Sequence, residues 1–248
     1  MRMLEKRMGR STRLLEVAWL SSLALACARP ACAEVEAGAI SAAVTLTSDY
    51  LFRGYSQTKG APALQAGLDY SGPLGLGFGA WASNVDFVSD GAPPDGADVE
   101  IDLFVTHGWK LGERVALDTT LIRYVYPGTT PGIDYDYNEL MLALHPGDVA
   151  TFTVVYANDA LASGEPALLY ELAASYPLPR GLELSTRLGY YDLERAFGSG
   201  YAYYALGLSW ELDTFKLGAR YEGADGAGRR LWGDDANARF VFEFSAGF

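Results

Sequence analysis

Charged and apolar side chains alternate along many segments of this chain of 248 residues. Successive side chains of a strand point to opposite faces, so the charges would gather on one face of a sheet. Carboxylates and guanidinium groups on the inner wall of a barrel would set the field acting on passing solutes. The candidate lining residues are Asp49, Arg53, Asp69, Glu100, Asp102, Asp118, Glu139, Glu171, Arg187, Lys216, Arg220, Arg239 and Glu243.

Twelve alternating segments, separated by turn residues, would carry these side chains. The links after even segments are short and those after odd segments are longer, as in transmembrane barrels and unlike Greek-key sandwiches. The predicted fold is therefore all-β, a transmembrane antiparallel up-and-down β-barrel of about 12 strands. The segments are 39–53, 62–70, 74–87, 99–109, 114–126, 136–145, 149–157, 167–176, 182–192, 201–211, 214–222 and 238–248.

The last segment has the clearest alternation, because Phe240, Phe242, Phe244 and Phe248 share one parity. It resembles the closing strand of bacterial outer-membrane barrels, which pairs with the first strand and is read by the assembly machinery. Rings on the outward parity are expected to form two interfacial girdles. The girdle candidates are Tyr50, Tyr70, Trp109, Tyr156, Tyr176, Tyr190, Trp210, Tyr221 and Phe248.

The N-terminus is predicted to be a cleaved signal peptide, residues 1–33, which leaves 34–248 as the barrel domain. A basic start precedes a short apolar core at Val17 to Ala28, and Ala31-Cys32-Ala33 has the form of a cleavage site. Both cysteines, Cys27 and Cys32, fall in the removed part. The formal net charge of -12 argues against a nucleic-acid partner.

One stretch, Ser48 to Gln57, carries a family resemblance and reads SDYLFRGYSQ. Together with the stretches from Pro62 to Tyr70, Trp81 to Phe87 and Glu100 to Leu103, it resembles the TorF-family porins of proteobacteria. The resemblance implies an outer-membrane barrel of porin type and carries over no solute. On a continuous first strand, Asp49 and Arg53 would share the lumenal face and meet Asp69 near the extracellular mouth. Such a patch would either contact the solute or clamp the first loop.

Acid–base chemistry is less favoured. The chain has two histidines, His107 and His145, which are expected at the periplasmic ends of their strands. It has no G-x-S-x-G and no H-E-x-x-H motif. The acidic loop at 89–98 does not match EF-hand spacing. We expect no catalytic residue, metal site or cofactor, although a barrel enzyme stays open as the weaker alternative.

The expected function is passive diffusion of small hydrophilic solutes or ions across the outer membrane. A cation preference is expected because the segments from 62–70 to 167–176 supply only acids to the lumen. The alternative is a structural or adhesive barrel plugged by internal ion pairs, since small barrels fill their interiors with side chains. Expected partners are outer-membrane lipid, lipopolysaccharide, the assembly machinery and the solutes. At Arg229 and Arg230, a plain exposed loop is favoured over a contact with lipopolysaccharide phosphates.

Overall fold

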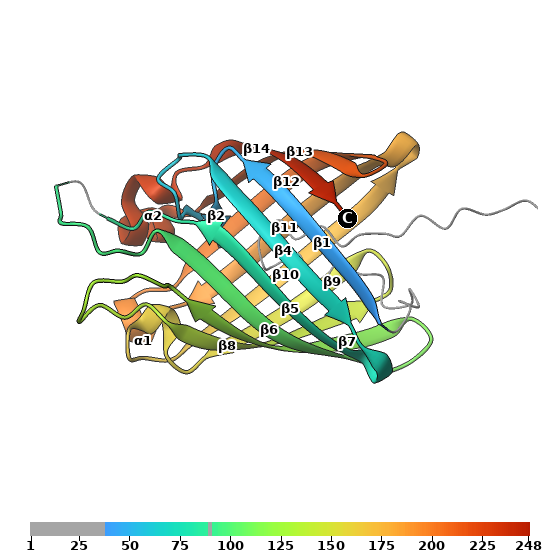
Figure 1. Cartoon of the computed structure of the whole chain (residues 1–248), viewed down its shortest axis with the longest axis horizontal. Helices are drawn as coiled ribbons and strands as arrows, with labels where there is room; N and C mark the ends of the chain where they lie inside the picture. Colours follow the sequence, from blue (N-terminus) through green and yellow to red (C-terminus); the bar gives the residue numbers. More distant parts are fainter. Residues whose placement is uncertain (1–37, 89–90) are drawn as a thin grey trace, which may run out of the picture.

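The computed structural model describes residues 38–88 and 91–248, so the predicted signal peptide lies outside the described residues. Within that part of the chain, twelve antiparallel strands close into a barrel (Figure 1). The strands are β1 (Ala39–Thr47), β4 (Ala63–Ser71), β5 (Leu76–Asn84), β6 (Val99–Lys110), β7 (Val115–Val125), β8 (Tyr137–Pro146), β9 (Ala150–Ala157), β10 (Ala167–Leu178), β11 (Leu182–Asp192), β12 (Tyr201–Leu212), β13 (Phe215–Ala224) and β14 (Arg239–Gly247). This confirms the predicted fold class.

The barrel closes between its first and last strands. β1 pairs antiparallel with β14 from Ala43 opposite Gly247 to Thr47 opposite Glu243. Beyond this register, the backbones of Ala42 and Phe248 exchange hydrogen bonds of 3.1 and 2.9 Å. Apart from this closure, each barrel strand pairs with the barrel strand that precedes it and the one that follows it in the sequence. The resulting order is the up-and-down topology that the alternating link lengths predict.

The two faces of the wall differ sharply in chemistry. On β12 and β14, Leu206 and Phe242 are 56% and 60% exposed, whereas their neighbours Ala205 and Val241 are buried. The same alternation recurs on the other strands, with large apolar side chains outside. Carboxylates, guanidinium groups and hydroxyls lie on the buried parity. A lipid-facing exterior around a polar interior is the arrangement of transmembrane barrels.

The first strand is shorter than predicted. β1 ends at Thr47, and residues 48–62 turn into the barrel instead of extending the wall to residue 53. There they form a small hairpin of β2 (Leu51–Phe52) and β3 (Tyr55–Ser56). We call residues 48–62 the inward loop. From β4 onward, strands begin and end within three residues of the predicted segments.

Short helices and turns lie at both ends of the barrel. The long-loop end carries α1 (Glu194–Phe197), α2 (Gly226–Trp232), η3 (Ala160–Ala162) and η5 (Gly233–Ala236). The other end has the turns η2 (Pro73–Gly75) and η4 (Pro179–Gly181). Figure 1 shows α2 beside the inward loop at the long-loop end. No helix among the described residues is long and apolar enough to cross a membrane.

The apolar core of the molecule lies inside the barrel, toward the long-loop end. Tyr50, Phe52 and Tyr55 of the inward loop pack there against rings from the wall, among them Tyr124 and Tyr201. Burying these rings supplies a driving force that holds the loop inside, because each aromatic side chain removes a large apolar area from water.

Candidate functional site

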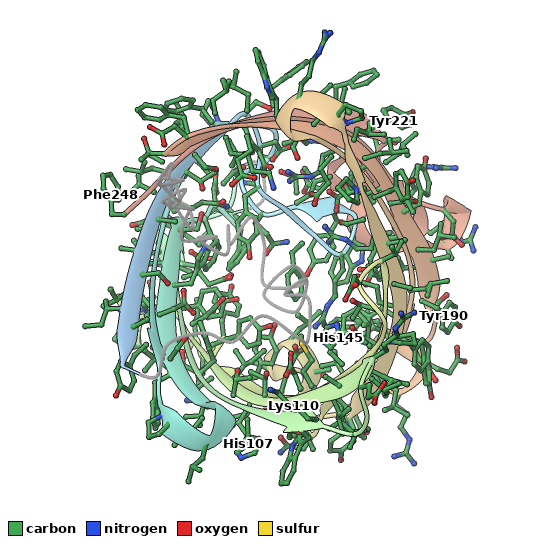
Figure 2. All side chains as sticks on the ribbon, turned by 90° about the vertical axis from the view of Figure 1, so that its right-hand side faces the viewer. His107, Lys110, His145, Tyr190, Tyr221 and Phe248 are labelled. Atoms are coloured by element: carbon green, nitrogen blue, oxygen red, sulfur yellow. The ribbon has the colours of Figure 1, made fainter. Side chains whose placement is uncertain are left out.

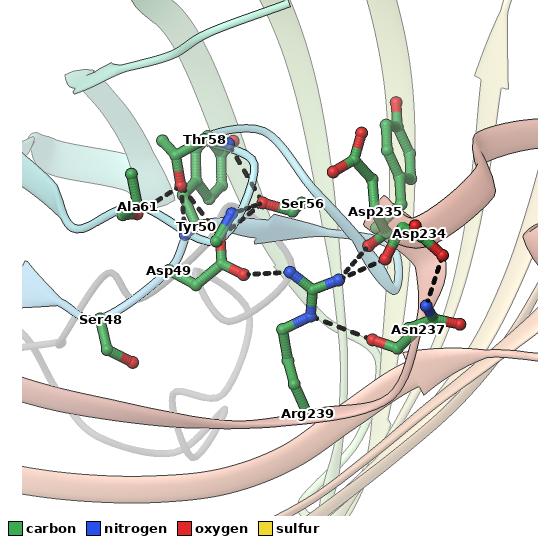
Figure 3. A network of polar contacts seen from close by, with 12 residues as sticks. Ser48, Asp49, Tyr50, Ser56, Thr58, Ala61, Asp234, Asp235, Asn237 and Arg239 are labelled. Atoms are coloured by element: carbon green, nitrogen blue, oxygen red, sulfur yellow. Dashed lines mark hydrogen bonds and ion pairs between the residues drawn. The ribbon is translucent and has the colours of Figure 1, made fainter. Parts of the chain in front are cut away.

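The root of the inward loop is fixed by a carboxylate. Asp49 is 2% exposed and accepts hydrogen bonds from Ser56 Oγ at 2.5 Å and from Arg239 Nη1 at 2.9 Å. Arg239, on β14, also donates to the backbone carbonyls of Asp234 and Asp235 in the last loop (Figure 3). One guanidinium group therefore links the wall, the inward loop and the last extramembrane loop.

The tip of the loop is fixed by an ion pair on the opposite wall. Arg53 Nη1 and Nη2 donate to the two carboxylate oxygens of Glu139, on β8, at 2.8 and 2.7 Å. The two side chains are 6% and 0% exposed. The hydroxyl of Tyr124 donates to the same carboxylate at 3.0 Å. A bidentate, buried pair of this kind fixes both distance and orientation.

Rings enclose the guanidinium group of Arg53. Its central carbon lies 4.4 Å from the ring centroid of Phe52 and 4.5 Å from that of Tyr191. Burial lowers the pKa of Arg53. The charge of Glu139, its hydrogen bonds and the neighbouring Tyr191 and Tyr124 together outweigh burial, so the pKa is raised well above its ordinary value. Arg53 is therefore a permanent cation inside the barrel.

Glycine is required where the tip touches the wall. Gly54 has a φ of 83°, a left-handed conformation that favours glycine. A Cβ added there would lie 2.6 Å from Cβ of Tyr203 and 2.8 Å from the carbonyl oxygen of Gly223. The hydroxyl of Tyr201 donates to the Arg53 carbonyl at 3.1 Å. The inward loop thus spans the interior from β1 to β12 and β13.

Two further carboxylates lie beside the tip, both on β6. Glu100 accepts hydrogen bonds from the hydroxyls of Tyr50 and Tyr126, each at 2.8 Å. Asp102 is 0% exposed, and neither of its carboxylate oxygens has a hydrogen-bond partner among the described residues. Its cross-strand neighbours are Trp81 and Tyr124. A buried carboxylate without a partner is unusual, because its desolvation is uncompensated.

Strands β10 to β14 carry a ladder of ion pairs. Arg187 Nε lies 3.8 Å from Glu171, which also accepts a 2.6 Å hydrogen bond from the hydroxyl of Tyr203. Arg220 bonds both Glu222 and Glu243. Nearer the short turns, Lys216 lies 3.7 Å from Glu183. The bases on this side of the interior are thus matched by acids.

The predicted lining residues take two kinds of position. Asp49 and Arg53 lie in the inward loop. The others lie on the inner parity of the strands: Asp69, Glu100, Asp102, Asp118, Glu139, Glu171, Arg187, Lys216, Arg220, Arg239 and Glu243. The expected patch of Asp49, Arg53 and Asp69 is wrong. Asp69 lies near the short-turn end of β4, opposite Ser41, and the chain reverses before it can place Arg53 on β1.

Most girdle candidates are exposed on the outer surface. Figure 2 shows Tyr190, Tyr221 and Phe248 outside the ring of strands. Exposure ranges from 39% to 75% for Tyr70, Trp109, Tyr156, Tyr176, Tyr190, Trp210, Tyr221 and Phe248. The prediction for Tyr50 is wrong, because this side chain is 1% exposed and packs against Trp81 inside the barrel. It follows the end of β1, so strand parity does not apply to it.

The two histidines lie on opposite faces of the wall. His107 shares the outward parity of β6 and packs against Trp109, with ring centroids 4.2 Å apart. His145 points into the barrel (Figure 2), where its ring nitrogens lie 3.1 Å from Thr151 Oγ1 and 3.2 Å from Asp118 Oδ2. The wall separates the two imidazoles, so they cannot act on one substrate together.

Several residues of the site are not among the sequence candidates. Tyr124, Tyr191 and Tyr201 contact the tip of the inward loop, and Trp232 of α2 stacks on Tyr55 at 4.5 Å. Tyr124 has the same parity as Asp118, and that signal could have placed it inside. Nothing comparable in the sequence marks Trp232, because it lies in a loop.

Comparison with known proteins identifies a family and a fold. The model of a family described as "Bacterial protein of unknown function (Gcw_chp)" matches residues 33–246. The KdgM porin is similar in structure, with a TM-score of 0.52 at 8% identity over 84% of this chain and 99% of that one. KdgM in complex with disordered oligogalacturonate gives 0.51 at 8% identity, over 84% and 98%. No curated protein matches the sequence. At this identity the likeness concerns the fold alone.

Proposed function

The chain belongs to the family of bacterial proteins of unknown function (Gcw_chp), and from its interior we propose that it is an outer-membrane channel for passive diffusion of small hydrophilic solutes. The observation that carries the proposal is the charged inner face of a closed barrel whose outer face is apolar. Facing lipid, each charge near the midplane would cost about 2–4 kcal/mol, whereas facing water it can act on solutes.

The inward loop would be the constriction of this channel. It crosses the interior and is fastened at its root by Asp49 and at its tip by Arg53. Below it, toward the short turns, the inner wall carries Asp118, Lys216 and Glu183, whose side chains are partly exposed. Solutes would therefore meet a narrow segment near the long-loop end and a wider polar segment beyond it.

Cation preference is part of the proposal. The inner faces of β4 to β10 carry six acids, no arginine and a single lysine, Lys110, which is the last residue of β6 next to a short turn. The acids are Asp69, Glu100, Asp102, Asp118, Glu139 and Glu171. Arg53 reaches this wall from the inward loop and neutralises Glu139. The structure of the KdgM complex contains an oligogalacturonate, which is a polyanion. An acidic wall would repel such a ligand, so we propose neutral or cationic solutes here.

We also propose that the chain is related to the TorF-family porins, which the stretch from Ser48 to Gln57 resembles. We propose further that it is exported through a cleaved signal peptide. Outer-membrane lipid and lipopolysaccharide would surround the apolar belt. The assembly machinery would read β14, which ends in the row from Phe240 to Phe248. We propose no enzymatic role.

A plugged structural barrel is the second candidate, and the inward loop itself favours it. Liposome swelling distinguishes the two. Vesicles containing the folded chain should swell in sugars and amino acids of graded size, fastest in the smallest, while vesicles with heat-unfolded chain should not. Permeation of lysine faster than glutamate would support the cation preference. A folded protein that leaves vesicles impermeable to every solute, down to glycine, would contradict the channel.

A further inference from the structure

The surroundings of Arg53 have the composition of a ligand site for a guanidinium group. The wall contributes Glu139 as a two-oxygen acceptor, the hydroxyl of Tyr124 to orient that carboxylate, and the ring of Tyr191 as a plate 4.5 Å from the guanidinium carbon. A carboxylate fork together with an aromatic face is how proteins hold planar guanidinium cations. Here the occupant is a residue of the chain itself.

The carboxyl groups at this place outnumber the one cation that the loop brings to them. The inner faces of β6 and β8 bring three carboxylates near the tip, those of Glu100, Asp102 and Glu139, and Arg53 pairs with Glu139. The oxygens of Glu100 accept tyrosine hydroxyls. Asp102 is fully buried without a hydrogen-bond partner in the described chain. Tyr124 connects the two strands, since it lies opposite Asp102 in register and bonds Glu139.

We propose that this wall is a binding site for guanidinium-bearing solutes and that Arg53 is its resident competitor. Such a solute displaces Arg53 from Glu139, uses the unpaired Asp102 as a further acceptor, and thereby releases the tip of the inward loop. The loop is suited to give up this contact, because only a short hairpin reaches the wall. Its two strands have two residues each, and Arg53 and Gly54 form the turn between them. This inference rests on the proposed channel function and names its solute class.

The alternative is that Arg53 and Glu139 form a permanent clamp with no ligand. Both interpretations require the ion pair, so disrupting the pair alone cannot separate them. They differ at Asp102, which the clamp does not use: neither carboxylate oxygen of Asp102 has a hydrogen-bond partner in the described chain, so neither binds the inward loop. A permanent clamp therefore gives Asp102 no role in loop release, whereas a solute site does.

Thiol labelling of the loop tests the proposal without requiring conductance. Gln57, 4% exposed in the inward loop, is replaced by cysteine in the full chain with Cys27→Ser and Cys32→Ser. The folded barrel is treated with a charged thiol reagent in methylguanidinium chloride, methylammonium chloride or tetramethylammonium chloride at equal ionic strength. We expect slow labelling alone, saturable acceleration by methylguanidinium, and little by the other two ions.

Variants supply the controls. Glu139→Gln should label fast without any probe and should not respond to methylguanidinium. Asp102→Asn should stay protected without the probe and need about tenfold more methylguanidinium, because a charge-assisted contact is lost. Glu183→Gln, a lumenal carboxylate paired with Lys216 near the short turns, should behave like the parent.

Two results would overturn the proposal. One is acceleration of the same size by all three cations, which would mean an effect of ions in general. The other is fast labelling in Glu139→Gln while the parent ignores methylguanidinium, which would mean a clamp without a ligand. Because the readout is loop exposure, either result can be obtained whether or not the barrel conducts, so failure of the channel function is separately recognisable.

Discussion

Removing the cation at the loop tip should open the barrel. In Arg53→Ala, Glu139 loses both of its guanidinium hydrogen bonds and keeps the hydroxyl of Tyr124. The side chains of the pair are 6% and 0% exposed, so this is a buried pair. Breaking such a pair by deleting one partner costs about 3–5 kcal/mol, because the remaining charge stays uncompensated.

This loss weakens the docking of the inward loop and leaves the barrel wall stable, because the backbone hydrogen bonds between strands hold the wall together independently of the loop. A loss of this size lowers the docking constant roughly a hundredfold or more. The anchor at Asp49 remains, so the tip should swing while the root stays attached. Arg53→Lys should lie between parent and alanine, because an ammonium keeps the charge but not the fork.

Single-channel recording in planar bilayers is the assay. Arg53→Ala should show larger and longer openings than the parent at the same voltage and salt. The double variant Arg53→Ala/Glu139→Gln should open similarly but unfold less easily, because no buried charge is left unpaired. Unchanged conductance in a correctly folded Arg53→Ala barrel, checked by its heat-modifiable gel mobility, would refute the assignment of the inward loop as the constriction.

Three further predictions follow from single contacts. Gly54→Val should release the loop tip, seen as faster thiol labelling with an unchanged barrel melting midpoint, because its Cβ would lie 2.6 Å from that of Tyr203. Trp232→Ala removes a ring stacked on Tyr55 and should release the loop less than Arg53→Ala in the same labelling assay, since such pairs contribute about 0.5–1.5 kcal/mol. Leu142→Arg, on the outer face of β8, should destabilise the barrel by about 2–4 kcal/mol in urea unfolding from vesicles, whereas Leu142→Ala should have a smaller effect.

The wall of the barrel could be predicted from the sequence, because each strand repeats a period of two over many residues. Parity predicts that Leu206, Leu142 and Phe242 face outward, and all three are exposed on the outer face. The same reasoning failed at Tyr50 and Arg53. Parity holds only while a strand continues, and nothing local in the stretch from Ser48 to Gln57 distinguishes a longer strand from a chain reversal.

The reversal depends on contacts made far away in the sequence. Arg53 adopts a φ of 50° and finds Glu139, 86 residues later, while Asp49 finds Arg239, 190 residues later. The sequence supplied the charges but not their partners. It did offer the clamp of the first loop as one of two interpretations, and the geometry of Asp49 with Ser56 and Arg239 agrees with that interpretation.

The central claim is that a closed wall, apolar outside and acidic inside, surrounds a path for cations. The reversal potential of single channels under a potassium chloride gradient tests it most directly. We predict discrete conductance steps whose reversal potential has the sign of potassium permeating faster than chloride, in the parent and more prominently in Arg53→Ala. A membrane that stays silent with both folded proteins, or a reversal potential of the chloride sign, would contradict it.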